Sequence, residues 1–198
     1  MANRGTALAH NADTAVTTNR PTAQPVVLRN WQQVVDKVDF AFQPIVSPHT
    51  GHVFGYEALL RCWDSAGFAS IQALFDTAWE TGNLHSVDMM LREKAIKKFA
   101  RLPGATRLKL FYNFDNRVIK TEDYQPGQTA KLLSDAGLER DTIFLEISER
   151  HDISNAQYLQ DILVRYRSQG FKIAIDDYGS GFAQLRAIYE CEPDIIKI

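Results

Sequence analysis

Short apolar runs and longer amphipathic runs alternate along the chain from residue 31 onward. The short runs suit β-strands, whereas the longer runs repeat apolar residues every three or four positions, as surface helices do. The predicted strands are residues 40–46, 53–61, 108–114, 143–148, 171–177 and 194–198. The predicted helices are residues 70–81, 86–101, 129–136, 156–169 and 182–189. This alternation predicts an α/β fold, built as a layered sheet or as a barrel.

The first 29 residues lack this pattern. They are rich in Ala, Thr and Asn and contain no aromatic residue, so they cannot bury enough surface to offset the entropy of ordering. We therefore expect residues 1–29 to be a flexible tail and residues 30–198 to form one domain. A targeting or partner-binding arm is the alternative, but Arg4, Arg20 and Arg29 are too dispersed to form a charged patch.

The composition excludes several classes of protein. The 198 residues are 45% hydrophobic and carry a net charge of −2, so the chain lacks the basic field of a protein that binds nucleic-acid duplexes. No apolar run has the roughly 18 to 20 residues that span a bilayer, and no signal peptide precedes the domain. Cys62 and Cys191 lie in unrelated contexts and are expected to be free thiols. These features predict a cytoplasmic protein.

Polar side chains gather at the carboxyl ends of the predicted strands. Because successive side chains of a strand point to opposite faces, Leu145 and Ile147 can pack on helices while Glu146 faces the other way. Asp176 ends the following strand in the same manner, and Asn113 ends the preceding one. Barrel enzymes carry their chemistry at these strand ends.

Five oxygen-bearing side chains form the candidate site: Glu57, Asn113, Glu146, Asp176 and Asp177. Carboxylates brought close together repel one another, and hard oxygen ligands suit Mg²⁺ or Mn²⁺ as the neutralising cation. Taken singly, each acid is more often a solvated surface residue. The adjacent Asp176 and Asp177 can serve one site only if the strand ends there, which the two glycines of the following Tyr-Gly-Ser-Gly segment permit.

Five motifs follow one another in the order found in EAL domains. They are Gln43-Pro-Ile-Val46, Glu57-Ala-Leu-Leu-Arg61, Glu146-Ile-Ser-Glu149, Asp176-Asp-Tyr-Gly-Ser-Gly181 and Ile195-Ile-Lys-Ile198. From about Phe40 to its last residue, the chain resembles an EAL-domain cyclic di-GMP phosphodiesterase. The resemblance implies a modified TIM barrel in which two Mg²⁺ or Mn²⁺ ions activate a water that linearises cyclic di-GMP to pGpG.

The resemblance also implies metal-binding and catalytic roles. Glu57, Asn113, Glu146 and Asp176 match the family's metal ligands, and Asp177 matches the residue that helps to hold the second metal and its bridging water. Glu57, Asp177 and Lys197 are the catalytic residues that the resemblance implies. Lys197 lies on an otherwise apolar strand and requires anions around it. A strand-end lysine that reaches solvent is the alternative.

Substrate contacts are implied for Gln43, Leu60 and Arg61. Arg61 shares a strand face with Glu57, where its guanidinium can bind a phosphate through two hydrogen bonds. A salt bridge between Arg61 and Glu57 is the alternative. Glu149 resembles the residue that stabilises the loop from Asp176 to Gly181.

The resemblance stops inside the sixth strand, at Ile198. We therefore expect an incomplete TIM barrel of EAL type, lacking the last two strands and the glutamate and glutamine that these bring to the site. Open sheet edges favour a homodimer or a strand-swapped oligomer. Two functions follow from the sequence: hydrolysis of cyclic di-GMP, and non-catalytic cyclic di-GMP sensing or protein interaction. A fragment without a stable fold is a third possibility. The presence of all five candidate ligands favours hydrolysis.

Overall fold

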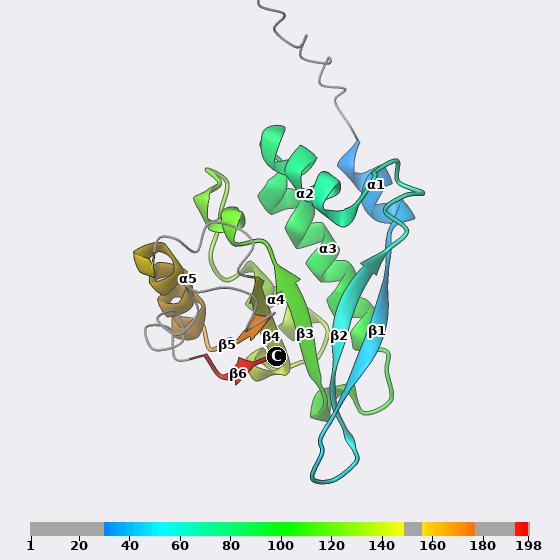
Figure 1. The fold of residues 1–198 in the computed structure, drawn as a ribbon, viewed down its shortest axis with the longest axis vertical. Helices are drawn as coiled ribbons and strands as arrows, with labels where there is room; N and C mark the ends of the chain where they lie inside the picture. The colour runs from blue at the N-terminus through cyan, green and yellow to red at the C-terminus, as the bar shows by residue number, and fades with distance from the viewer. Residues whose placement is uncertain (1–29, 149–155, 177–192, 198) are drawn as a thin grey trace, which may run out of the picture.

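The computed structural model describes residues 30–148, 156–176 and 193–197 (Figure 1). Six strands of this part of the chain form one sheet, in sequence order. They are β1 (Asp39–Val46), β2 (Val53–Arg61), β3 (Lys109–Phe114), β4 (Ile143–Ser148), β5 (Lys172–Asp176) and β6 (Ile195–Ile196). β1 pairs with β2 antiparallel, and all later neighbours pair parallel. This mixed α/β sheet matches an incomplete TIM-like barrel, in which β1 and β6 are the edges of the described sheet.

Helices cover one face of this sheet. The α-helices are α1 (Trp31–Lys37), α2 (Ile71–Glu80), α3 (Leu84–Phe99), α4 (Gln128–Asp135) and α5 (Ala156–Ser168). In the described part of the chain there are also three short 3₁₀ helices, η1 (Ala105–Arg107), η2 (Asn116–Lys120) and η3 (Arg140–Thr142). The longest helix, α3, runs behind β1, β2 and β3 (Figure 1) and contacts α1, α2 and α4. It is therefore the centre of the helical layer.

The two faces of the sheet pack differently. On the helix side, Leu145 and Ile173 are fully buried in the main core cluster. On the opposite side, the rings of Phe111 and Phe144 stack with centroids 4.7 Å apart, next to Ala174. The alternation that the sequence predicts for β4 and β5 is confirmed. As a result, the polar ends of β4 and β5 lie on the face opposite the helices, which we call the inner face.

The predicted strands agree with the structure to within one residue at each end, except for the shorter β6. The predicted helix 86–101 begins two residues earlier, as α3 (Leu84–Phe99). The predicted helix 182–189 and the tail 1–29 lie outside the described residues, so the division of the chain at residue 29 stays a prediction. In the part that the structure describes, no helix is long and apolar enough to cross a membrane.

The sequence pattern did not predict α1, which has seven residues. The side chain of Asn30 caps its start by accepting a hydrogen bond from the backbone N–H of Gln33. At its end, the Lys94 ammonium donates to two carbonyl oxygens, at 2.5 and 2.7 Å. Trp31 stacks on Phe68, with ring centroids 6.1 Å apart. Tertiary contacts therefore stabilise a helix too short to show a clear period.

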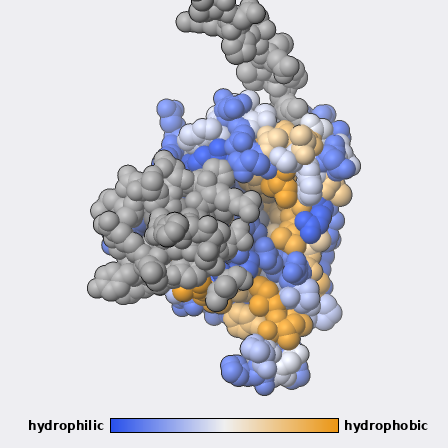
Figure 2. Space-filling model, in the orientation of Figure 1, coloured by the Kyte–Doolittle hydropathy of each residue, from blue (hydrophilic) through white to orange (hydrophobic). Residues whose placement is uncertain are grey.

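The hairpin between β1 and β2 extends beyond the rest of the sheet (Figure 1). Its outer strand ends expose three apolar side chains, Val46, Val53 and Phe54. Figure 2 shows apolar surface on this lower part of the visible face, above a polar hairpin tip. The Phe54 ring also lies 6.2 Å from that of Phe111 and thereby anchors the hairpin to the inner face of the sheet.

The backbones of β2 and β3 approach each other closely at Gly55. A Cβ atom at this position would overlap the backbone carbonyl of Lys109 on the neighbouring strand. We therefore expect Gly55→Ala to force β2 away from β3 and to lower the free energy of unfolding by about 1–3 kcal/mol. Urea denaturation measures this loss as a lower midpoint. A midpoint equal to that of the wild-type chain would contradict the expectation.

Candidate functional site

Three carboxylates from three different strands meet at the carboxyl end of the sheet. Glu57 lies in β2, Glu146 in β4 and Asp176 at the end of β5. Each offers an oxygen, and these oxygens all lie within 4.8 Å of one another. The parallel register explains the meeting, because it aligns strand ends that are far apart in the sequence. We call these three residues the acidic cluster.

Lys197, which follows β6, lies against the whole acidic cluster. Its ammonium nitrogen is 2.8 Å from Glu57 Oε2, 2.7 Å from Glu146 Oε1 and 3.1 Å from Asp176 Oδ1. The Lys197 side chain is 24% exposed. The predicted need for anions around this lysine is thus met in the structure.

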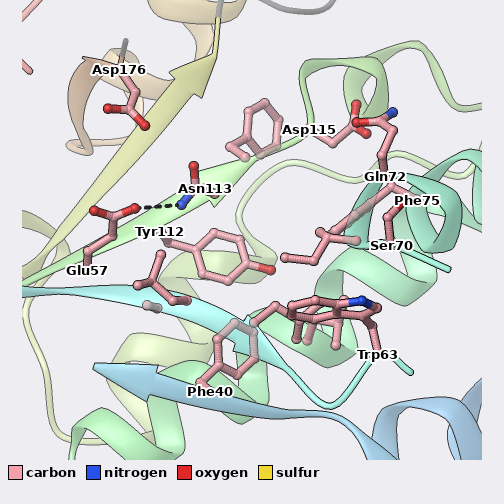
Figure 3. Close-up of a pocket in the computed structure, with 16 residues that line it drawn as sticks. Phe40, Glu57, Trp63, Ser70, Gln72, Phe75, Tyr112, Asn113, Asp115 and Asp176 are labelled. Atoms are coloured by element: carbon pink, nitrogen blue, oxygen red, sulfur yellow. Dashed lines mark hydrogen bonds between the residues drawn. The ribbon is translucent and has the colours of Figure 1, made fainter. Parts of the chain in front are cut away.

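Asn113 reaches the acidic cluster from β3. Its amide Nδ2 donates a hydrogen bond to Glu57 Oε1 at 3.2 Å, drawn as the dashed line in Figure 3. In the register of β3 and β4, Asn113 pairs with Glu146. With the amide nitrogen directed at Glu57, the amide oxygen of Asn113 is left as a further oxygen donor beside the carboxylates.

Burial makes Glu146 the most perturbed acid of the cluster. Its side chain is completely buried, and burial raises its pKa to about 7, with Lys197 opposing the rise and Glu57 adding to it. The pKa of Lys197 is also raised above its usual value. Burial alone would lower the pKa of this lysine, but the neighbouring Glu146 and Glu57 outweigh the effect of burial. Lys197 therefore stays charged at neutral pH.

The donor set of the acidic cluster fits a divalent cation. Neither oxygen of the buried Glu146 accepts a hydrogen bond of good geometry from the residues that the structure describes. Among the residues that the structure describes, the three carboxylates form ion pairs with one ammonium group, that of Lys197, which leaves an excess of negative charge. Carboxylate and amide oxygens are the ligands that Mg²⁺ and Mn²⁺ prefer. The residues present therefore suit the ions predicted from the sequence.

A cavity of about 580 Å³ opens next to the acidic cluster. Glu57, Asn113 and Asp176 lie at one end of it (Figure 3). The other end is lined mainly by apolar and aromatic side chains, among them Phe40, Leu60, Trp63, Phe75 and Tyr112. Such a cavity combines a few polar groups with an apolar wall, as small-molecule sites do.

The remaining predicted site residues lie at different distances from the acidic cluster. Gln43 is exposed on β1, directly opposite Glu57 in the strand register. Leu60 is buried in the main core and lines the cavity. Arg61 is partly buried, and its guanidinium donates to the carbonyl oxygen of Leu60 at 3.0 Å. The predicted roles of Asp177 and Glu149 lie outside the described residues.

Sequence reasoning missed two features around the site. Trp63, which lies between β2 and α2, and Tyr112 of β3 line the same cavity only because the fold brings these segments together. A second charged group, the ion pair of Asp88 with Arg92 on α3, is buried behind β3. The signal for this pair was present in the sequence, because acid and base four residues apart share a helix face.

The raised pKa of Glu146 predicts a pH dependence for the metal-free chain. Its pKa rises from 4.5 to about 7 on folding, so the folded chain binds this proton more tightly than the unfolded chain. Stability should therefore fall as pH rises from about 4.5 to about 7. Thermal unfolding at a series of pH values, with a chelator present, checks this. The decrease in stability between these pH values should be smaller for Glu146→Gln than for the wild-type chain. Parallel pH profiles for the two proteins would contradict it.

Comparison with known proteins places this site in a family. The family model of the EAL domain matches residues 29–198. A probable cyclic di-GMP phosphodiesterase, PdeI of Escherichia coli K12, is 28% identical over 181 residues, which cover 87% of this chain and 23% of that protein. Another, PdeB of the same organism, is 26% identical over 159 residues, 79% of this chain and 30% of that protein. The chain thus spans between 23% and 30% of the length of these relatives.

Solved structures agree with this match. BlrP1 of Klebsiella pneumoniae, in complex with calcium and cyclic di-GMP, is 28% identical with a TM-score of 0.68 over 82% of this chain and 40% of that chain. The manganese and cyclic di-GMP complex of the same protein gives 27% identity and a TM-score of 0.66, with the same coverage. Fold, motif order and family match coincide, and the chain belongs to the EAL domain family.

Proposed function

We propose that this chain binds cyclic di-GMP in the cavity beside the acidic cluster and hydrolyses it to pGpG. The observation that carries the proposal is the meeting of Glu57, Glu146 and Asp176, with oxygens within 4.8 Å of one another at the edge of a 580 Å³ cavity. Support comes from two relatives whose names read "probable cyclic di-GMP phosphodiesterase" and from the manganese and cyclic di-GMP complex of BlrP1. Because the chain spans only part of those relatives, the activity is a proposal for this chain.

The chain's own oxygens would hold two Mg²⁺ or Mn²⁺ ions. Glu57, Asn113, Glu146 and Asp176 are the proposed ligands, and Asp177 is the proposed further ligand. Bound there, the ions would supply Lewis-acid chemistry that lowers the pKa of a water and offsets the charge of a phosphodiester.

Protein side chains would orient the substrate and balance its charge. Lys197, held within 3.1 Å of the carboxylates, can stabilise negative charge that develops on the phosphate. Arg61 is proposed to bind a phosphate, with Gln43 and Leu60 in contact with the nucleotide. The aromatic part of the cavity wall, including Trp63, gives a purine ring an apolar surface.

Product analysis tests the hydrolysis. The purified chain is incubated with cyclic di-GMP and Mn²⁺, and pGpG is measured by chromatography, with Glu57→Ala as the matched inactive control. Formation of pGpG above that control is expected. No pGpG above the Glu57→Ala level would overturn the proposal of hydrolysis.

Binding without hydrolysis is the second candidate function. It is favoured by the contacts of Lys197, whose ammonium group supplies a positive charge to all three carboxylates. A sensor of this kind would bind cyclic di-GMP tightly and release no pGpG. Titration calorimetry combined with the product assay separates the two candidates.

We propose three further properties of this chain. Glu149 is proposed to stabilise the loop that begins at Asp176. β1 and β6, the edges of the sheet as far as the structure describes it, are proposed to pair in a homodimer or strand-swapped oligomer, since strand edges recruit other strands. Light scattering across a range of concentrations tests this. The cytoplasm is the proposed location, because an exposed, unpaired Cys62 suits a reducing compartment.

A further inference from the structure

Asp88 and Arg92 form an ion pair inside the helical layer, on the opposite face of the sheet from the acidic cluster. They lie one turn apart on α3, and their side chains are 0% and 2% exposed. Arg92 Nη1 also donates to the hydroxyl of Thr129 on α4, at 2.5 Å. Desolvation makes such a buried ion pair a weak source of stability. Conformational specificity is the better-attested use of buried charge.

The ion pair contacts both neighbours of Asn113 on β3. The guanidinium carbon of Arg92 lies 5.3 Å from the ring centroid of Tyr112 and 5.3 Å from that of Phe114. The Tyr112 hydroxyl donates to Asp88 Oδ1 at 3.3 Å. The Asp88–Arg92 ion pair thus contacts both Tyr112 and Phe114 and holds their rings on the helical face of the sheet.

Asn113 depends on these neighbours for its orientation. Its own side chain is exposed, and its amide donates a rather long hydrogen bond of 3.2 Å to Glu57. Because side chains alternate along a strand, fixing residues 112 and 114 on one face directs residue 113 to the other. A register slip or twist of β3 would carry the Asn113 oxygen away from the acidic cluster.

We propose that Arg92, with Asp88, is a positioning residue for cation binding: it fixes Tyr112 and Phe114 so that the Asn113 amide stays beside Glu57. The inference deepens the proposed function and rests on it, since it takes Asn113 to be a ligand of the divalent cation. It assigns no contact between Arg92 and substrate or ion. The effect of Arg92 passes through the backbone of β3.

A charge-free replacement separates positioning from stability. In the full chain, Arg92→Met is combined with Asp88→Leu, because apolar side chains of similar volume often replace a buried ion pair without loss of stability. Mn²⁺ binding is measured by electron paramagnetic resonance of the free ion, and folding by thermal unfolding with a chelator. The double variant should unfold near the wild-type midpoint and bind Mn²⁺ roughly 10-fold more weakly, the lower end of the effect of residues that orient metal ligands.

A thermodynamic cycle then tests the route through Asn113. Asn113→Ala alone should weaken Mn²⁺ binding, and adding the two α3 substitutions to Asn113→Ala should weaken it no further. Leu133→Ala, which opens a cavity in the same helical layer, is the matched control and should lower the unfolding midpoint at unchanged Mn²⁺ affinity. An additive loss in the Asn113→Ala background would overturn the inference.

The remaining outcomes are also decisive. Unchanged Mn²⁺ affinity in the double variant overturns the inference and leaves the proposed function intact. Absence of Mn²⁺ binding by the wild-type chain overturns both. If the double variant fails to fold, Arg92→Lys replaces it, since lysine keeps the charge beside Asp88 but removes the planar group from the two rings. That variant should fold and bind Mn²⁺ more weakly than wild type, and wild-type affinity in it overturns the inference.

Discussion

Glu146→Gln should abolish Mn²⁺ binding, raising the dissociation constant by more than about 100-fold, the largest effect that residues orienting a ligand produce. Glutamine keeps the size of the side chain and removes its charge from the centre of the acidic cluster. The Glu146 side chain is completely buried, and its oxygens accept no well-formed hydrogen bond from the described residues. Among the described residues, only Glu57 and Asp176 join it in offering carboxylate oxygens to the acidic cluster. Titration calorimetry measures the loss, and pGpG formation should fall with it.

Glu139→Gln is the matched control for this prediction. It makes the same chemical change at an exposed position before β4 and should leave Mn²⁺ binding unaltered. Equal Mn²⁺ affinity in the Glu146→Gln chain and the wild-type chain would show that the acidic cluster is not the cation site.

Lys197→Met should destabilise the metal-free chain and increase its response to Mn²⁺. Lys197 is itself 24% exposed, but its partner Glu146 is completely buried. Removing the partner of this buried carboxylate costs about 1–3 kcal/mol, which for a chain of this size lowers the unfolding midpoint by roughly 2 to 12 °C. The three carboxylates then face one another without a cation. Because a ligand that binds only the folded state stabilises it, Mn²⁺ should raise the midpoint of this variant more than that of the wild type. Calorimetric scans with chelator and with Mn²⁺ measure both effects.

Lys172→Met tests whether the position of the charge matters. Lys172 pairs with Asp194 at 2.8 Å, but its side chain is 46% exposed, so the loss should be below about 1 kcal/mol. The same Mn²⁺ response as wild type is expected for this control. A Lys197→Met chain that behaves like Lys172→Met would remove Lys197 from its proposed place in the site.

The sequence pattern was sufficient to predict the position of a residue where that position depends only on the residue's own strand. The alternation in 143–148 and 171–177 placed Glu146 on the inner face and Asp176 at the end of its strand, and both positions are confirmed. The ordered motifs identified the family, which supplied the order of the strands. These features are local or shared by relatives, so a single sequence carries them.

The sequence pattern did not predict features that depend on contacts between residues far apart in the chain. The short α1 ends on the ammonium of Lys94, 56 residues beyond Val38, and no local period reports such a contact. The spacing of Asp88 and Arg92 is the same for a solvated surface pair and for a buried one. Only the packing of β3 and α4 against α3 shows that this pair is buried. Burial of a charge is therefore a property of the fold and not of the motif.

The hydrogen bond from Lys197 to Glu57 joins residues 140 positions apart in the chain. The entropic cost of closing a loop rises with its length, and contacts of such long range tend to form late in folding. β2, β3 and β4 can therefore bring Glu57 and Glu146 together before the ammonium arrives. A divalent ion present at that stage would neutralise them first. Refolding should thus be faster with Mg²⁺ in the medium, which makes the ionic environment part of the folding pathway.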